Sequence, residues 1–353
     1  MTSFKKEHDV VVVGAGAGGL TAAVALNGAG VDIAVLEARD RVGGRLLSID
    51  AEPGRIDLGA TWFWANEAKI KALIANGGLD AFAQHTAGAM MFQVPEGTQQ
   101  VPNQLSSPAG RIAGGMQSIT ELLASQLPQE TIRLETVVTS ITRVDDGLVV
   151  SASGDTWSAK HVVLAIPPAL ALHTIDFDGG LSDHVAAVAR ATPVWMGSTV
   201  KVVATFDRPF WREAGLAGAG FSYTGPMREI HDMSGPGGTP AAIFGFCALA
   251  PGAPAPTQAE VIEQLVSLFG NEASTPREVS VMDWRSEQHT SPPNVEQLAD
   301  YQTYGHRVFQ DPAMDGRLHW ASTETATMTP GHIEGALVAG ERAVRAILSS
   351  TEN

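Results

Sequence analysis

The 353-residue sequence predicts an α/β fold that begins with a parallel β-sheet covered by helices. Residues 9–13, an aspartate and four valines, form a run typical of a strand buried on both faces. Glycines and alanines follow at 14–19, and an alanine-rich helix is expected to continue to about Asn27. A second apolar run at 31–36 completes a βαβ unit, because two parallel strands need a helical crossover.

The rest of the chain alternates between helical and extended patterns, without an internal repeat. In the first half we expect a helix at 66–76, a loop or short strands at 87–108, a helix at 114–127, strands within 132–152 that turn near residue 146, and a buried strand at 161–166 that ends at two prolines. In the second half we expect strands of a different sheet at 198–206 and 241–249, a linker at 250–256, a helix at 258–269, a short strand at 318–322 and a final amphipathic helix at 332–348.

Composition excludes several classes of protein. Hydrophobic residues make up 44% of the chain, which is enough for a large core and argues against disorder. The formal net charge of −15 argues against a nucleic-acid partner, because phosphate binding needs a basic face. A single cysteine, Cys247, fits a reducing cytoplasm, where we expect the protein to act. The apolar run at 10–26 mimics a signal peptide, but its glycines favour a strand, turn and helix, and no membrane span is expected.

Three glycines after the first strand have the GxGxxG spacing that is typical of dinucleotide binding. Gly14 permits a tight turn, Gly16 lets the backbone approach a pyrophosphate, and Gly19 lets the helix pack against the strand. The N–H groups at the helix N-terminus then point at the phosphates. Glu37 ends the second strand, where a carboxylate accepts hydrogen bonds from ribose hydroxyls and repels the 2′-phosphate of NADP. The flanking strand and helix disfavour the alternative, a glycine-rich turn without a ligand.

The sequence that follows this motif carries a family resemblance. Residues 37–45, Glu-Ala-Arg-Asp-Arg-Val-Gly-Gly-Arg, together with the glycine motif resemble the flavin-containing amine oxidases, the family of monoamine and polyamine oxidases. Residues 318–341 are similar to the closing segment of that family. Shorter matches lie between them in the family's order, at 57–62, 114–116, 162–167, 198–201 and 207–211. The resemblance implies FAD rather than NAD, a Rossmann-like FAD-binding domain of the glutathione-reductase type, and an inserted substrate domain built on a mixed β-sheet with helices.

The resemblance also implies a set of FAD contacts. Arg45 and the glycine turn before it would supply charge and backbone donors, and Val138 would hold adenine through its backbone. Glu324 matches an acid near the phosphates and the ribityl chain, and the positive end of the last helix would face the flavin. Arg41 is expected on the solvated surface, and Arg39 is left open between surface and cofactor. The implied cofactor-binding residues are Gly14, Gly16, Gly19, Glu37, Ala38, Arg39, Gly43, Gly44, Arg45, Gly59, Ala60, Thr61, Trp62, Val138, Glu324 and Ile333.

Three residues are implied in catalysis. Lys201 lies inside the apolar run 200–203, where a lysine is costly to bury, and the family uses such a lysine to hold a water against flavin N5. The alternative is an edge-strand lysine that faces solvent. Trp284 matches a tryptophan near the flavin, with a core tryptophan as the alternative. His332 stands at the second of two positions where the family flanks the flavin with aromatic guides, and the first has no clear match near Pro292. The alternative for His332 is a histidine that merely lies near a helix N-terminus.

The predicted substrate pocket is largely aromatic and neutral, with Phe63, Trp64, Phe246 and His289 as its candidate residues. An amino-acid carboxylate usually needs a fixed arginine, and no motif ties an arginine to the reactive face. The sequence therefore favours an uncharged, apolar or aromatic amine over an amino acid or a long polyamine. The family's helical insertion between residues 105 and 111 is mostly missing, which predicts a wide entrance.

One departure from the family and two missing patterns narrow the chemistry. Membrane-bound members attach FAD through a cysteine, whereas residues 291–294 read Ser-Pro-Pro-Asn, so we expect non-covalent FAD. Cys247 is interpreted as a small buried hydrophobe. The histidines at 289, 306, 319 and 332 lack metal-ligand spacing, so no metal is expected, and no Gly-x-Ser-x-Gly elbow supports a serine hydrolase.

We expect an FAD-binding domain made of residues 1–70, 111–178 and 310–353, and a substrate-binding domain made of 71–110 and 179–309. The expected reaction passes hydride from the α-carbon of an amine to flavin N5, gives an imine and reduces O₂ to H₂O₂. Two alternatives stay open: an FAD-dependent dehydrogenase or desaturase that acts on C–C or C–O bonds with another acceptor, and a non-catalytic flavin-binding redox partner. The expected partners are a small-molecule amine and O₂, without nucleic acid or membrane. The sequence leaves open which amine is used and whether the protein forms a homodimer.

Overall fold

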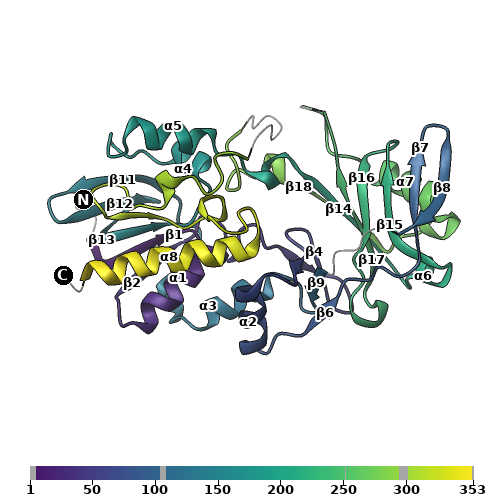
Figure 1. Ribbon diagram of the computed structural model, residues 1–353, viewed down its shortest axis with the longest axis horizontal. Coiled ribbons are helices and arrows are strands. Elements are labelled where there is room, and N and C mark those ends of the chain that lie inside the picture. The colour runs from purple at the N-terminus through teal and green to yellow at the C-terminus, as the bar shows by residue number, and fades with distance from the viewer. Residues whose placement is uncertain (1–4, 104–108, 251, 294–300, 352–353) are drawn as a thin grey trace.

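A computed structural model describes residues 5–103, 109–250, 252–293 and 301–351 of the chain. Its two seven-stranded sheets lie toward opposite ends of an elongated molecule, and Figure 1 shows short strands and helix α2 between them. The predicted α/β fold with a second sheet is confirmed.

The first sheet contains the predicted βαβ unit. Strands follow the order β10-β2-β1-β13-β12-β11, and β19 adds to β13. Strand β1 is parallel to β2 and β13, and β13 is parallel to β19. The strands are β1 (Lys5–Val13), β2 (Ile33–Leu36), β10 (Ile132–Arg133), β11 (Val138–Val144), β12 (Gly147–Ala152), β13 (Asp155–Leu164) and β19 (Leu318–Trp320).

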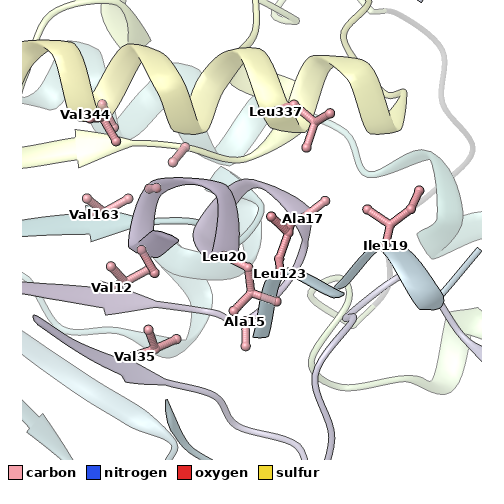
Figure 2. Close-up of a cluster of buried hydrophobic side chains, with 14 of the residues drawn as sticks. Val12, Ala15, Ala17, Leu20, Val35, Ile119, Leu123, Val163, Leu337 and Val344 are labelled. Atoms are coloured by element: carbon pink, nitrogen blue, oxygen red, sulfur yellow. The ribbon is translucent and has the colours of Figure 1, made fainter. Parts of the chain in front are cut away.

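Helices cover both faces of this sheet, which explains the continuous valine run in β1. Val10 and Val12 pack toward α1 (Ala17–Gly28) and α8 (Ile333–Thr351), in the cluster shown in Figure 2. Val11 and Val13 pack on the opposite face, into a cluster with α4 (Pro168–Thr174) and α5 (Asp183–Ala191). Alternate side chains of a strand point to opposite faces, so a strand between two helical layers must be apolar throughout.

Helices α1 and α8 approach each other closely at a pair of glycines. A Cβ atom on Gly18 would lie 3.0 Å from the carbonyl oxygen of Ala336 in α8, and one on Gly340 would lie 2.4 Å from the carbonyl oxygen of Gly18 in α1. Both distances are below van der Waals contact with backbone atoms. The chain's last helix therefore presses directly on the first turn of its first helix.

The second sheet is mixed and has the order β18-β14-β17-β16-β15-β7-β8. Helix α7 (Gln258–Phe269) packs its apolar face on this sheet and begins with a capping box between Thr257 and Glu260. The strands are β7 (Ala89–Val94), β8 (Gly97–Pro102), β14 (Val200–Phe206), β15 (Leu216–Ser222), β16 (Met227–Asp232), β17 (Ala241–Cys247) and β18 (Glu278–Asp283), with α6 (Phe210–Glu213) beside them.

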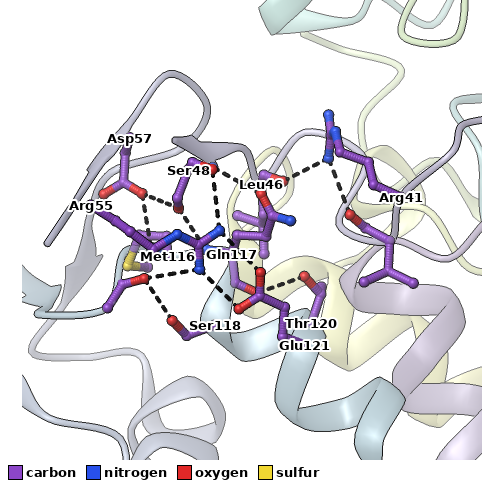
Figure 3. Close-up of polar contacts among 12 residues, drawn as sticks. Arg41, Leu46, Ser48, Arg55, Asp57, Met116, Gln117, Ser118, Thr120 and Glu121 are labelled. Atoms are coloured by element: carbon purple, nitrogen blue, oxygen red, sulfur yellow. Dashed lines mark hydrogen bonds and ion pairs between the residues drawn. The ribbon is translucent and has the colours of Figure 1, made fainter. Parts of the chain in front are cut away.

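Short elements and a polar hub connect the two sheets. In Figure 3, Asp57 accepts hydrogen bonds from Ser48 Oγ at 2.6 Å and from the Met116 N–H at 2.8 Å, while Arg55 pairs with Glu121. The connecting elements are β3 (Ser48–Asp50), β4 (Arg55–Asp57), β5 (Phe63–Trp64), α2 (Ala68–Asn76), β6 (Ala81–Ala83), β9 (Ala109–Ile112) and α3 (Ser118–Ser125). Single 3-10 turns lie at Gln129–Thr131, Trp195–Ser198, Pro236–Gly238, Asn271–Ser274, Trp284–Ser286, Arg307–Phe309 and Thr323–Thr325.

The described residues follow most predicted elements within a few positions. The segment at 87–108 contains the β7–β8 hairpin, which lies at the edge of the second sheet. Strands β15, β16 and β18 and helix α5 were not predicted. Helix α5 packs on α4 and adds Ala189 to the core of the first sheet, although it lies in the stretch expected to belong to the substrate domain.

Candidate functional site

A cavity of about 700 Å³ lies where the two sheets meet. Its first wall comes from loops at the carboxyl ends of parallel strands β1, β2, β13 and β19, the edge where α/β sheets bind ligands. Its second wall includes Phe246 of β17 and Glu229 of β16. A neighbouring cavity of about 610 Å³ shares Gly14, Glu37 and His289 with it and reaches Val138.

The glycine loop has the geometry that the motif predicts. Gly14 has φ 99°, in the left-handed region that favours glycine. Gly16 borders the cavity, and a Cβ there would meet nothing closer than 3.9 Å, so the backbone is open to a ligand. A Cβ on Gly19 would lie 2.0 Å from the Gly14 carbonyl oxygen, which explains the third glycine as a packing requirement. Helix α1 begins at Ala17 without a side-chain cap, so its first N–H groups remain available to an anion.

Glu37 lies at the boundary between the two cavities. Its buried carboxylate accepts hydrogen bonds from the N–H groups of Ala15 at 2.7 Å and Arg39 at 2.9 Å, which fixes it beside the glycine loop. Arg39 is not a surface residue. Its guanidinium donates to Glu287 at 3.3 Å and to Thr290 Oγ1 at 2.9 Å, so it ties this end of the cavity to the segment after β18.

Two further arginines shape the turn at Gly43 and Gly44. Both glycines have positive φ and border the cavity. Arg41 was expected on the solvated surface, and the structure corrects this: it is half-buried and donates to the carbonyl oxygens of Val42, Gly44 and Leu46, as Figure 3 shows in part. Arg45 borders the cavity and forms a two-pronged ion pair with the fully buried Glu324.

Lys201 is completely buried, so the solvent-edge alternative is wrong. Its Nζ donates to the Gly59 carbonyl oxygen at 2.8 Å and to the Thr61 hydroxyl, and it lies 4.5 Å from the centre of the Phe244 ring. Burial lowers the pKa of Lys201 to about 7, although the nearby Asp57 acts in the opposite direction. Gly59 and Thr61 border the cavity, whereas Lys201 does not and lies behind these two residues.

One end of the cavity is aromatic, and it contains some but not all of the residues expected in the substrate pocket. Trp62, Trp64 and Phe246 border it, together with Trp195. Phe63 does not: it belongs to the core of the first sheet and lies over Gly110, where a Cβ would come within 2.2 Å of its ring. The reason is the two-residue period of an extended chain, which turns Phe63 away from the side that Trp62 and Trp64 share.

Trp284 and His332 differ in their relation to the cavity. Trp284 is fully buried, donates from its indole nitrogen to the Leu58 carbonyl oxygen at 2.9 Å, and does not border the cavity. His332 borders the cavity immediately before α8, and its ring lies 4.6 Å from that of Trp64. His289 also borders the cavity, and so does Ile333 in the first turn of α8.

Sequence reasoning missed several cavity residues. Tyr301 and Tyr304 form an edge-to-face pair with ring centroids 5.0 Å apart, and burial raises the pKa of Tyr304. Only one weak sequence feature indicated these residues: two of the chain's three tyrosines lie within 301–304. No sequence pattern indicated that Trp195 and Glu229 border the cavity, because Trp195 lies in a turn and Glu229 in the unpredicted strand β16.

The residues of the two cavities fit the FAD that the resemblance implies. The glycine cradle and the uncapped start of α1 suit a pyrophosphate, and Glu37 suits ribose hydroxyls. Ser322 borders the same cavity, and its Oγ is buried with no hydrogen-bond partner among the described residues. A buried hydroxyl without a partner is costly, and a bound polar molecule would satisfy it.

Within the described ranges, no group of three or more histidine, cysteine, aspartate or glutamate side chains could hold a metal ion. No helix in the part of the chain that the structure describes has both the length and the apolar character needed to cross a bilayer.

Comparison with known proteins gives a consistent result. Residues 79–348 match the family described as flavin containing amine oxidoreductase, and residues 12–76 match an NAD(P)-binding Rossmann-like domain. Putrescine oxidase from Kocuria rosea is 26% identical over 98% of this chain and 96% of its own. A probable flavin-containing monoamine oxidase A from Dictyostelium discoideum is 24% identical over 96% and 97%. The solved structure of cyclohexylamine oxidase from Brevibacterium oxydans has the same fold, with a TM-score of 0.84, 21% identity, and coverage of 98% of this chain and 100% of that one.

Proposed function

Because the chain belongs to the family of flavin-containing amine oxidoreductases, we propose that it binds FAD non-covalently and oxidises a small apolar or aromatic amine with O₂. The observation that carries this proposal is the cavity itself. It runs from a dinucleotide-type cradle at Gly14 and Glu37 to an aromatic chamber at Trp62, Trp64 and Phe246.

Residues at one end of this cavity would bind the cofactor, and residues at the other end would bind the amine. At one end, the N–H groups of α1 would hold the pyrophosphate and Glu37 the ribose, while Arg45 keeps its charge near the phosphates through its pair with Glu324. At the other end, Trp64 and Phe246 would exclude water and orient the amine. When bound, the flavin supplies the hydride chemistry and passes two electrons to O₂.

The proposed catalytic residues act at the junction of these two ends. Lys201, fixed by Gly59 and Thr61, would hold a water at the inner wall, and Trp284 would support the Leu58 backbone beside it. Val138 would contact adenine in the neighbouring cavity. We also propose that the protein acts in the cytoplasm, that it has the two-domain division given above, and that it forms a homodimer. Cell fractionation would test the first proposal, limited proteolysis the second, and sedimentation the third.

The arginines of the cavity support an amine over an amino acid as substrate. An amino-acid carboxylate usually needs a free arginine fork. The arginines that border the described cavity are Arg39, which binds Glu287 and Thr290, and Arg45, which binds Glu324. Neither fork is open to a carboxylate.

A peroxide-coupled screen tests the proposal. The purified protein would be mixed with apolar and aromatic amines, diamines and the matched amino acids, with flavin absorbance recorded without O₂ and H₂O₂ recorded with O₂. We expect reduction and peroxide with apolar and aromatic amines. Faster reduction by amino acids would contradict the substrate proposal. Reduction without peroxide would instead indicate a dehydrogenase, and no reduction by any compound would indicate a non-catalytic flavoprotein.

A further inference from the structure

Glu67 is a buried carboxylate beside the cavity that the proposed function does not yet use. It is 1% exposed and precedes the first residue of α2, a position from which a polar side chain can cap the helix. Glu67 does not do so. One oxygen accepts a hydrogen bond from the Trp64 N–H at 2.8 Å, and the other lies 2.7 Å from Nδ1 of His332.

A second glutamate explains why Glu67 is available. Glu334, in the first turn of α8, accepts hydrogen bonds from the N–H groups of Lys69 at 3.0 Å and Ile70 at 2.8 Å. The start of α2 is therefore capped by a residue of α8. Because the cap comes from another helix, the Glu67 carboxylate is left to bind His332.

His332 is held rigidly, with one ring nitrogen directed into the protein. Its ring lies against Trp64, and its carbonyl oxygen accepts a hydrogen bond from Thr323 Oγ1 at 2.6 Å. Its side chain is nevertheless 42% exposed and borders the cavity. Since Nδ1 is engaged by Glu67, Nε2 is the nitrogen that can meet a ligand, and no protein partner for it is found among the described residues.

We propose that Glu67 and His332 form a dyad that removes a proton from the substrate ammonium before oxidation. This inference rests on the proposed amine oxidation. Alkyl amines carry a proton near pH 7, as lysine does, and a protonated nitrogen has no lone pair to support loss of hydride from the neighbouring carbon. A neutral amine must form first.

The proton transfer is balanced within the dyad. With Nδ1–H donating to Glu67, the lone pair of the neutral imidazole lies on Nε2. One N–H bond of the ammonium breaks, its electron pair stays on the amine nitrogen, and the proton forms a new bond to Nε2. The positive charge passes to the imidazole ring, where the Glu67 carboxylate stabilises it. The proton then leaves to water, because the side chain is partly exposed.

Other titratable groups near the dyad are already engaged or lie elsewhere on the cavity wall. Glu334 is bound to α2, and Glu229 on β16 pairs with His231 at 2.7 Å. Tyr301 and Tyr304 complete the aromatic end of the cavity. His332 is therefore the group to which we assign the proton.

Substrate basicity provides a sharp test. Flavin reduction would be followed without O₂ at pH 7 with 2-phenylethylamine and with its 2,2-difluoro analogue, a much weaker base because fluorine withdraws electrons. In His332→Phe, we expect the rate with 2-phenylethylamine to fall by about 100-fold, the usual contribution of a general base. The rate with the difluoro amine, which is largely neutral already, should fall by less than about 3-fold on the same reasoning. Equal losses for the two amines would overturn the dyad.

Two variants separate the proton step from structural support. Glu67→Gln keeps the size of the side chain but removes the carboxylate charge, and it should show the same dependence on amine basicity as His332→Phe. Glu334→Gln alters the hydrogen bonds that join the start of α2 to α8, and it leaves the contact between Glu67 and His332 in place. It should lower stability and leave the two amines affected equally. A basicity-dependent loss in Glu334→Gln, or its absence in Glu67→Gln, would count against the dyad.

A binding measurement gives a readout that is independent of turnover. Cumylamine has no hydrogen on the carbon beside its nitrogen, so it binds without reacting, and its N,N,N-trimethyl derivative has no N–H to donate. By calorimetry, the unaltered holoenzyme should prefer cumylamine by about 10-fold, the worth of one hydrogen bond to a charged group. His332→Phe should abolish the preference. An unaltered protein without this preference would overturn the dyad, whereas failure of every amine to reduce the flavin despite the preference would overturn the oxidase proposal alone.

Discussion

Lys201 shows how much one residue can depend on its surroundings. It is the second residue of β14, paired with Phe246 on one side and Met282 on the other, and no part of it reaches solvent. An isolated buried ammonium would be prohibitive, so the carbonyl oxygen of Gly59 and the Thr61 hydroxyl replace its water. Its pKa near 7 means that a small change in pH decides whether the buried amine behind Gly59 and Thr61 is charged.

This pKa predicts a specific pH dependence of stability. In the unfolded chain the lysine keeps its proton to about pH 10.4, whereas in the folded chain it loses the proton near pH 7. Between these values the unfolded state binds one proton more, so this group raises the free energy of unfolding by up to about 1.4 kcal/mol per pH unit. The cost of burying the charge is present in full below pH 7 and is relieved as the pH rises.

Urea unfolding at pH 7, 8 and 9 measures the effect, with Lys201→Met as the reference that removes the group. We expect the unaltered protein to gain about 2 kcal/mol relative to this variant between pH 7 and 9. Parallel pH profiles for the two proteins would show that the amine keeps an ordinary pKa.

At the scale of single residues, the sequence predicted which residue types surround the cavity better than it predicted the direction in which each side chain points. Glu37, Arg45 and Trp64 border the cavity, and Glu324 is joined to it through its ion pair with Arg45. Phe63 and Trp284 face the core, and nothing in a two-residue strand such as β5 indicates which side meets a cavity. No sequence pattern indicated Glu67 as a site residue. Its carboxylate is available to His332 only because Glu334 of α8, far away in sequence, caps α2 instead.

At the scale of elements, the contact between α1 and α8 positions the start of the cofactor cradle. The two helices meet backbone to backbone at Gly18 and Gly340. Since α1 carries the N–H groups that would face the pyrophosphate, any displacement of α8 is transmitted to that site. Packed backbones have no flexible side chain to absorb such a change.

We therefore expect Gly340→Ala to be harmful although alanine is the better helix former. Alanine in an open helix position stabilises by about 1 kcal/mol relative to glycine, but the new methyl group would meet the Gly18 carbonyl oxygen at 2.4 Å. Overpacking of this kind costs about 1–3 kcal/mol. Thermal unfolding and FAD titration would show lower stability and weaker FAD binding.

Gly28→Ala is the matched control, because a Cβ at this end of α1 meets nothing within 4 Å. It should leave FAD affinity unchanged and stability equal or higher. If both variants behaved alike, the close approach of the two helices would not be a constraint.

Some elements were predicted almost to the residue, whereas the amphipathic helix α5 and several strands were missed. Helix α7 was expected at 258–269 and occupies Gln258–Phe269. Strand β15 reads Leu-Ala-Gly-Ala-Gly-Phe-Ser, with little β-branched content, and its place is fixed only by pairing with β16 and β7. Such strands depend on neighbours from distant parts of the chain, which a local pattern does not record.

At the scale of the whole molecule, the described residues contain one cysteine, and it lies away from the proposed flavin. Cys247 ends β17, is buried and does not border the cavity; burial raises the pKa of its thiol to about 12. A thiol of this kind is a poor nucleophile. This property supports the proposal that FAD is held by contacts alone.

Acid precipitation of the yellow protein tests this directly. We expect the flavin to appear in the supernatant and to co-elute with authentic FAD, leaving a colourless pellet. Flavin that stays with the pellet after washing in denaturant would contradict non-covalent binding. Glu37→Ala provides the comparison, because it removes the ribose acceptor and should weaken FAD retention in the native protein.

The position of β19 and α8 in the first sheet has a consequence for biosynthesis. Strand β19 pairs with β13, and α8 packs on α1, so the last segments described complete a sheet that the first segments begin. A ribosome adds about 5–20 residues per second, so the stretch between β13 and β19 takes on the order of ten seconds to make. During that interval the carboxyl end of β13 has one unpaired edge, and α1 lacks the cover of α8, while the second sheet is already emerging. The contact between α1 and α8 at Gly18 and Gly340 can therefore form only after α8 has been made.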